Sequence, residues 1–105
     1  MTARQSANDG PLLRRTTCIE RSGDGAGFEA VDGDARFGEL CAALWATAVR
    51  RALALGADEP SALSVESRSG AVVAVRDGDR VLMGVVAEGV PPSAARYALE
   101  RRLER

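Results

Sequence analysis

Hydrophobic and polar positions follow a two-residue period in the second half of the chain. The stretch 63–67 alternates, 71–75 is almost continuously apolar, and 80–88 is apolar on both of its faces. A two-residue period is typical of β-strands, and strands that are apolar on both faces are typical of a sheet covered on both sides. Turn residues separate the three stretches at 68–70 and 77–78. The pattern predicts three antiparallel strands with both faces of their sheet buried.

The first part of the chain predicts a shorter pair of strands. Residues 12–20 carry a β-branched cluster, and 28–31 form a second short apolar stretch. The glycine-rich segment 22–27 lies between them, and we interpret it as the hairpin loop. Residues 1–10 are polar, and we expect them to be a disordered tail before a single domain over 11–105.

A helical period begins after Asp34. Apolar residues recur at helical spacing over 35–55, where Asp34 is a suitable N-cap and Gly56 a suitable stop. A second helix is predicted over 94–104, with Ser93 as its cap. The element order is therefore β-β-α-β-β-β-α. This order predicts an α+β fold: a five-stranded antiparallel sheet with a long central helix, a C-terminal helix and one helix on each face.

The long helix carries more apolar surface than one core needs. One apolar stripe consists of Phe37, Leu40, Cys41, Leu44, Ala48, Ala52 and Leu55. A second stripe beside it consists of Ala42, Trp45, Ala46, Val49 and Leu53. Together they span roughly 200° of the helix, against about 100° for a helix that covers one core. We expect the second stripe to contact another subunit through Trp45, a large aromatic residue among alanines. The alternative is that Trp45 packs in the core of its own chain.

Composition narrows the possible chemistry. The chain has no histidine and no lysine, so the usual general base and the usual metal ligand are missing. Its formal net charge of -1 argues against nucleic acid as a partner. Cys18 and Cys41 form no CxxC motif, and we interpret both as buried thiols in a reducing compartment. The sequence therefore predicts no catalytic residue, no metal site, no cofactor and no enzymatic activity.

Segments that would direct the chain to a membrane are not evident. Residues 1–10 lack the apolar region of a signal peptide, and the longest apolar runs, 71–75 and 81–87, are far too short to span a bilayer. We therefore expect a cytoplasmic protein that does not bind a membrane.

The C-terminal part carries a resemblance to a known family. From Gly70 it reads GAVVAVRDGDRVLMGVVAEGVPPSAARYALERRLE. This run combines a glycine turn, a valine-rich strand, an Asp-Gly turn, a VLxxVVA strand and a helix with an Arg-Tyr-x-Leu segment. It resembles prokaryotic members of the roadblock / dynein light chain family. The resemblance covers about 62–103, and over 12–55 it consists of a hairpin and a long helix.

The resemblance implies a roadblock- or profilin-like fold and a homodimer, or a heterodimer with a related chain. In such dimers the long helix and the strand after it pair with their equivalents. Together with the second stripe, this gives an expected interface of Ala42, Trp45, Ala46, Val49, Leu53, Leu63 and Val65. Family members are non-enzymatic platforms, so the resemblance also implies a regulatory or scaffold module that acts with a small Ras-like GTPase. They usually begin with a helix before the first strand, and residues 1–10 are too few and too polar to form a complete one.

A second function belongs to another class. A small-ligand sensor domain of profilin-like or PAS-like architecture has a similar element order. Such a sensor needs an internal cavity with convergent polar groups. The last two predicted strands offer few of them, since they are made mainly of Val, Leu, Met and Gly.

Overall fold

The computed structural model describes residues 12–23 and 27–104 and confirms the predicted α+β fold. Its strands are β1 (Leu13–Arg21), β2 (Phe28–Ala30), β3 (Ala62–Ser67), β4 (Gly70–Asp77) and β5 (Arg80–Val86). Its helices are α2 (Ala35–Ala54) and α3 (Pro92–Leu103). The expected tail, 1–10, and the middle of the loop 22–27 lie outside the described residues.

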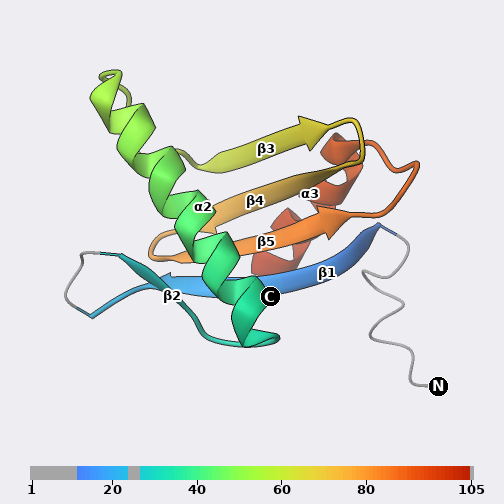
Figure 1. Cartoon of the computed structure of the whole chain (residues 1–105), viewed down its shortest axis with the longest axis horizontal. Coiled ribbons are helices and arrows are strands. Elements are labelled where there is room, and N and C mark those ends of the chain that lie inside the picture. The colour runs from blue at the N-terminus through green and yellow to red at the C-terminus, as the bar shows by residue number, and fades with distance from the viewer. Residues whose placement is uncertain (1–11, 24–26, 105) are drawn as a thin grey trace.

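The five strands form one antiparallel sheet in the order β2-β1-β5-β4-β3 (Figure 1). In the β4–β5 hairpin, Asp77 pairs with Arg80, so Gly78 is the first of two loop residues. Gly78 has a φ of 64°, which glycine adopts without steric cost. The hairpin predicted at this point is therefore confirmed. β5 is the central strand of this order, and β2 and β3 are the two edges of the sheet.

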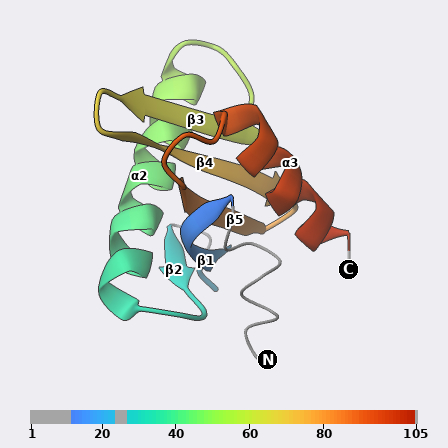
Figure 2. The same ribbon diagram turned by 90° about the vertical axis from the view of Figure 1, so that its right-hand side faces the viewer.

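One helix covers each face of the sheet (Figure 2). The cluster on the α2 face contains Ile19, Cys41, Ala42, Trp45, Ala74, Val81 and Met83. The cluster on the α3 face contains Leu13, Cys18, Val73, Val75, Leu82, Val86, Ala95 and Leu99. Both clusters are made of apolar side chains, whose burial supplies most of the driving force for folding.

The two helices begin in different ways. The carboxylate of Asp34 accepts a hydrogen bond from the N–H of Phe37, which confirms the predicted N-cap. This bond holds the pKa of Asp34 below its ordinary value. The prediction that Ser93 caps α3 is wrong, because the helix starts at Pro92 with Pro91 as its N-cap and no side-chain cap. Proline suits the first helical position, where its fixed φ fits and no N–H needs a partner.

Candidate functional site

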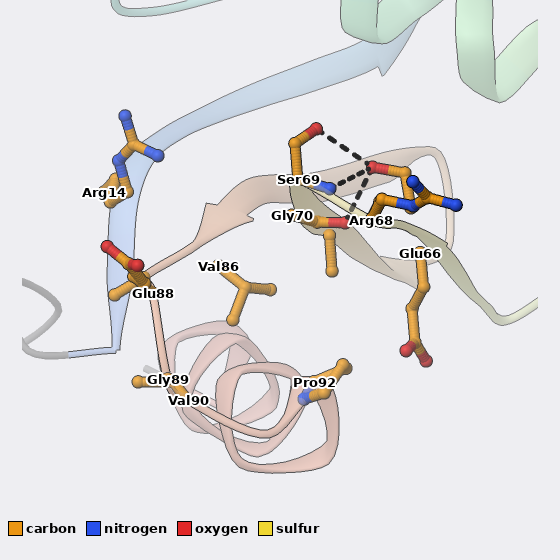
Figure 3. A pocket seen from close by; sticks show the side chains of 13 residues that line it. Arg14, Glu66, Arg68, Ser69, Gly70, Val86, Glu88, Gly89, Val90 and Pro92 are labelled. Carbon is orange, nitrogen blue, oxygen red and sulfur yellow. Dashed lines mark hydrogen bonds between the residues drawn. The ribbon is translucent and has the colours of Figure 1, made fainter.

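A polar pocket of about 430 Å³ lies between the β3–β4 turn and the start of α3 (Figure 3). The charged side chains that line it are Arg14, Glu66, Arg68 and Glu88. The turn engages the hydroxyl of Ser67, which accepts from the N–H of Ser69 at 3.3 Å and donates to the carbonyl of Gly70 at 3.2 Å. Charges of both signs and an engaged hydroxyl give this pocket no clear preference for a ligand.

The two thiols lie on opposite faces of the sheet. Cys18 is buried in the cluster beneath α3, and Cys41 in the cluster beneath α2. Burial raises the pKa of both thiols, that of Cys41 to about 11. The prediction of buried thiols is therefore confirmed, and both pack as small apolar groups.

Over 12–23 and 27–104, no group of three or more Cys, Asp or Glu side chains is placed to hold a metal ion. In the same part of the chain, neither helix is both long and apolar enough to cross a membrane.

Trp45, the expected centre of a contact between subunits, lies inside its own chain. Its side chain has no exposed surface and belongs to the same buried cluster as Ile19 and Met83. Ala42, also expected at the interface, is only 8% exposed. The expectation that Trp45 contacts a partner is corrected, because a fully buried side chain leaves no surface for one.

Gly38 explains this orientation of α2. A Cβ at this position would collide with the Cβ of Ala30 on β2, so the helix approaches β2 this closely only with glycine here. With Gly38 against the sheet, Cys41 and Trp45 follow on the same side of the helix. Gly38 was not predicted as a contact from the sequence, although a glycine inside a long helical pattern is a signal of close packing.

The side of α2 that faces the sheet therefore runs between the two predicted stripes. Leu40 and Leu55 of the first stripe turn outward and are 61% and 86% exposed. Leu53 of the second stripe is 55% exposed. Figure 1 shows that the C-terminal end of α2 extends past β3. Leu53 lies in the last turn of this helix, and Leu55 is its C-cap. We call the exposed residues at this end, 53–55, the α2 overhang.

β3 presents an unpaired edge in the described part of the chain. The N–H of Arg76 donates to the carbonyl of Ser61 at 2.9 Å, just before β3 begins. The alternation of an antiparallel ladder then points the backbone groups of odd-numbered β3 residues toward β4. Those of even-numbered residues, with Ser64 at their centre, point outward. Such an edge is a ready site for pairing with another strand.

Three valines lie side by side on the α2 face next to this edge. Val65 is paired with Val72, and Val72 with Val85, so the three cross β3, β4 and β5 in a straight row. Val65 is 43% exposed, and the other two are partly buried. α2 packs most closely on β2 and β1, which lie toward the opposite edge of the sheet from β3. This valine row therefore extends an apolar surface to the open edge.

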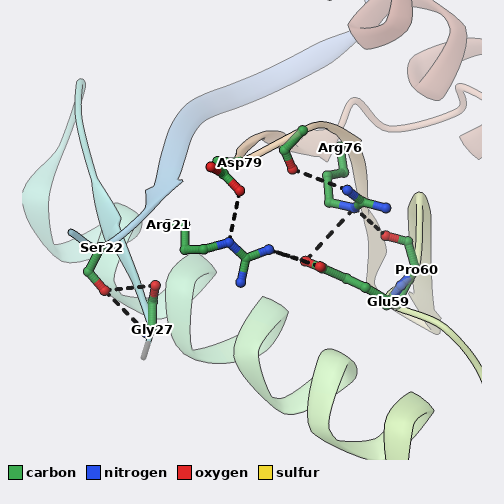
Figure 4. Close-up of polar contacts among 8 residues, drawn as sticks. Arg21, Ser22, Gly27, Glu59, Pro60, Arg76 and Asp79 are labelled. Carbon is green, nitrogen blue, oxygen red and sulfur yellow. Dashed lines mark hydrogen bonds and ion pairs between the residues drawn. The ribbon is translucent and has the colours of Figure 1, made fainter. Parts of the chain in front are cut away.

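An ionic network holds the linker between α2 and β3 (Figure 4). The guanidinium of Arg21 donates to both carboxylate oxygens of Glu59 and to Asp79, each at 2.9 Å. Arg76 donates to the carbonyl of Pro60 at 2.8 Å and lies 3.8 Å from Glu59. The hydrogen bonds to Asp79 and Glu59 raise the pKa of Arg21. The network fixes the point at which the chain leaves α2 and enters β3.

The structure separates the seven residues expected at an interface. Leu53 and Val65 are exposed on the α2 overhang and on β3. Four others belong to the α2-face cluster or pack against it: Ala42, Trp45, Val49 and Leu63. Ala46 follows Ala42 by one turn of α2 and lines with it a groove between α2 and β2. The outward backbone groups of β3 and the valine row were not predicted from the sequence. Both depend on which strands are neighbours in the sheet.

No protein-family model matches this chain, and no curated protein matches it. Its function is therefore inferred from its own residues and surfaces.

Proposed function

We propose that this chain is a non-enzymatic regulatory or scaffold module that forms a dimer and acts with a small Ras-like GTPase. We infer the dimer from one observation. The unpaired edge of β3, the valine row and the α2 overhang all lie at the same end of the sheet. An open strand edge can pair with another chain, and exposed apolar side chains are unfavourable in water. One contact between subunits covers all three features.

A second copy of the chain fits this edge. A two-fold axis beside Ser64 pairs β3 with its equivalent in antiparallel fashion and joins two sheets into one. Each α2 overhang then reaches past its own β3 toward the valine row of the partner, which removes apolar surface from water. The same axis sets Glu66 opposite Ala62 of the partner subunit, so no like charges face each other.

The GTPase part of the proposal rests on the resemblance to the roadblock family. The dimer gives it a physical form, because two α2 helices side by side make one surface across the two-fold axis and a monomer offers half of it. Arg50 and Arg51 are exposed near the C-terminal end of α2, at the border of this surface. Charges at a border influence orientation and association rate more than affinity.

The alternative of a small-ligand sensor has less support. A ligand cavity needs polar groups that converge on it. Among the described residues, the buried hydroxyl of Thr17 donates to the carbonyl of Asp32 at 3.2 Å, and the buried indole N–H of Trp45 has no hydrogen-bond partner. One engaged hydroxyl and one single donor do not make a set of converging polar groups, so the dimeric module is the function that the chain supports better.

Two proline variants in β3 test the dimer. Ser64→Pro removes an N–H that points outward, whereas Val65→Pro removes one that points toward β4. We expect light scattering at micromolar concentration to give the mass of two chains for the wild type and of one chain for folded Ser64→Pro. Val65→Pro should lower the melting temperature. A wild-type protein with the mass of one chain overturns the proposal, and a dimeric Ser64→Pro overturns pairing through β3.

Calorimetric titration tests the GTPase partner. The dimer is titrated with small GTPases of its source organism, each loaded with GDP or with a GTP analogue, and Ser64→Pro is the matched monomer. We expect the dimer to bind one nucleotide state more tightly and the monomer to bind at least about tenfold more weakly. Equal binding to both states supports a scaffold without regulation. A folded dimer that binds none of them overturns this part of the proposal.

A further inference from the structure

A groove of about 550 Å³ lies between α2 and β2, at the edge of the sheet opposite β3. Phe28 and Ala30 line it from β2. The side chains that line it from α2 are mostly methyl groups: Ala35, Ala42, Ala43 and Ala46. Methyl groups leave space for a backbone to approach the helix. Ala42 and Ala46, which were expected at the dimer interface, therefore lie beside the edge of the sheet opposite β3.

The outer edge of β2 carries unpaired backbone groups in the described part of the chain. The N–H of Val31 donates to the carbonyl of Cys18 at 3.0 Å, which fixes the alternation of the β1–β2 ladder. Glu29 then directs its backbone groups toward β1, and Phe28 and Ala30 direct theirs away from it. These two residues offer two donors and two acceptors beside the groove.

The charges at this edge set a preference for a basic partner. Glu29 lies directly opposite Glu20 of β1, on the face away from the groove, and Glu20 in turn lies opposite Arg80 of β5. Neither carboxylate has an ion-pair partner among residues 12–23 and 27–104. Like charges opposite each other destabilise a strand pair. Glu39, also without an ion pair there, lies on the α2 side of the groove. Arg80 supplies an opposite charge on one side of Glu20, and a basic residue on the outer side of Glu29 would do the same for Glu29.

We propose that β2 binds an extended segment of a partner protein, which adds a strand to the sheet. Its small or β-branched apolar residues enter the groove, and a Lys or Arg between them lies beside Glu29. Backbone hydrogen bonds to Phe28 and Ala30 supply affinity, and the alternating side chains supply specificity. A bound helix would leave those backbone groups unpaired, which favours the strand. The site does not depend on the dimer, because β3 is the other edge of the sheet.

The probe is a short synthetic peptide that alternates valine with lysine, and its matched control alternates valine with glutamate. We expect the lysine peptide to shift the NMR signals of 28–30 and 35–46 and to slow amide hydrogen exchange at Phe28 and Ala30. The glutamate peptide should bind at least about tenfold more weakly. No binding of the lysine peptide overturns the proposal. Shifts without slower exchange at Phe28 and Ala30 overturn strand addition, because a helix or a loose contact does not protect these amides.

Charge reversal provides the matched variants. Glu29→Lys places opposite charges at positions 20 and 29, so the hairpin stays folded, and Glu88→Lys changes an exposed glutamate outside the groove. We expect Glu29→Lys to bind the lysine peptide at least about tenfold more weakly than the wild type and the glutamate peptide more tightly. Glu88→Lys should bind both peptides with an affinity close to that of the wild type. Equal weakening in both variants would indicate attraction by overall charge and overturn the proposal.

Discussion

The two helices cover the sheet in different ways. α3 has 12 residues, packs on β4 and β5, and buries Ala95 and Leu99 completely. α2 has 20 residues and buries Trp45 completely, but it leaves Leu53 and Leu55 exposed beyond β3. Because α2 is longer than the sheet it crosses, it carries apolar side chains that its own core does not use.

The position of an exposed apolar side chain decides what it means. α3 exposes Tyr97, whose ring lies 5.8 Å below the guanidinium of Arg101. Single cases of this kind are normal on protein surfaces. The exposed leucines of the α2 overhang lie at the same edge as unpaired backbone groups and Val65. A combination of apolar surface and an open strand edge indicates an interface more strongly than either feature alone.

The largest expected effect separates the core of α2 from its overhang. Trp45→Ala should lower the free energy of unfolding by about 3–5 kcal/mol, because it opens a cavity beneath the helix. Leu99→Ala on α3 should cost about 2–5 kcal/mol for the same reason. Leu55→Ala should change it by at most about 0.5 kcal/mol while weakening the dimer. Denaturant unfolding measures the free energy of unfolding, and light scattering measures the dissociation of the dimer. If Trp45→Ala dissociated the dimer without changing the free energy of unfolding, Trp45 would contact the partner subunit after all.

A smaller effect tests the contact that orients α2. Alanine favours helix over glycine by about 1 kcal/mol, yet Gly38→Ala should destabilise the protein by about 1–3 kcal/mol, because its methyl group meets Ala30. The double variant with Ala30→Gly should lose less than the sum of the single changes. Thermal unfolding of all four proteins gives the coupling. A stabilised Gly38→Ala would contradict the close approach of α2 to β2.

The next effect compares ionic contacts near the two helices. Glu59→Gln should cost about 1–2 kcal/mol, because the side chains of Glu59 and Arg21 are only 23% and 27% exposed and share two hydrogen bonds. Glu100→Gln breaks the exposed pair with Arg96 on α3 and should cost at most about 0.5 kcal/mol. Urea unfolding at low salt compares the two. Equal costs would show that the network does not hold the linker.

The smallest effect concerns the cap of α2, which α3 lacks. The pKa of Asp34 is lower in the folded chain, so its contribution is complete above the ordinary value of 3.8 and is lost as pH falls through the lower folded value. Asp34→Asn keeps a capping side chain without the charge. Its melting temperature should therefore fall less than that of the wild type between about pH 5 and pH 3. Parallel curves for the two proteins would contradict this.

Local patterns in the sequence determined the elements of this fold. The alternation over 63–67 and the apolar run 71–75 predicted strands that the structure confirms as Ala62–Ser67 and Gly70–Asp77. Asp34 was identified as the cap of the long helix because capping depends on residues within one turn. The start of α3 was missed by two residues, because Pro92 itself suits the first helical position. Strand period, turn residues and caps are short-range properties, so the sequence alone carries them.

The tertiary structure alone decided how α2 faces the sheet. Both stripes of the helix are apolar, so their periodicity gave no reason to prefer one of them. The contact of Gly38 with Ala30 across space selected the line between the stripes. It buried Trp45 and left Leu53 and Leu55 outside. Packing against another element settles this choice, because the helical period fixes which residues share a side and not which side lies against the sheet.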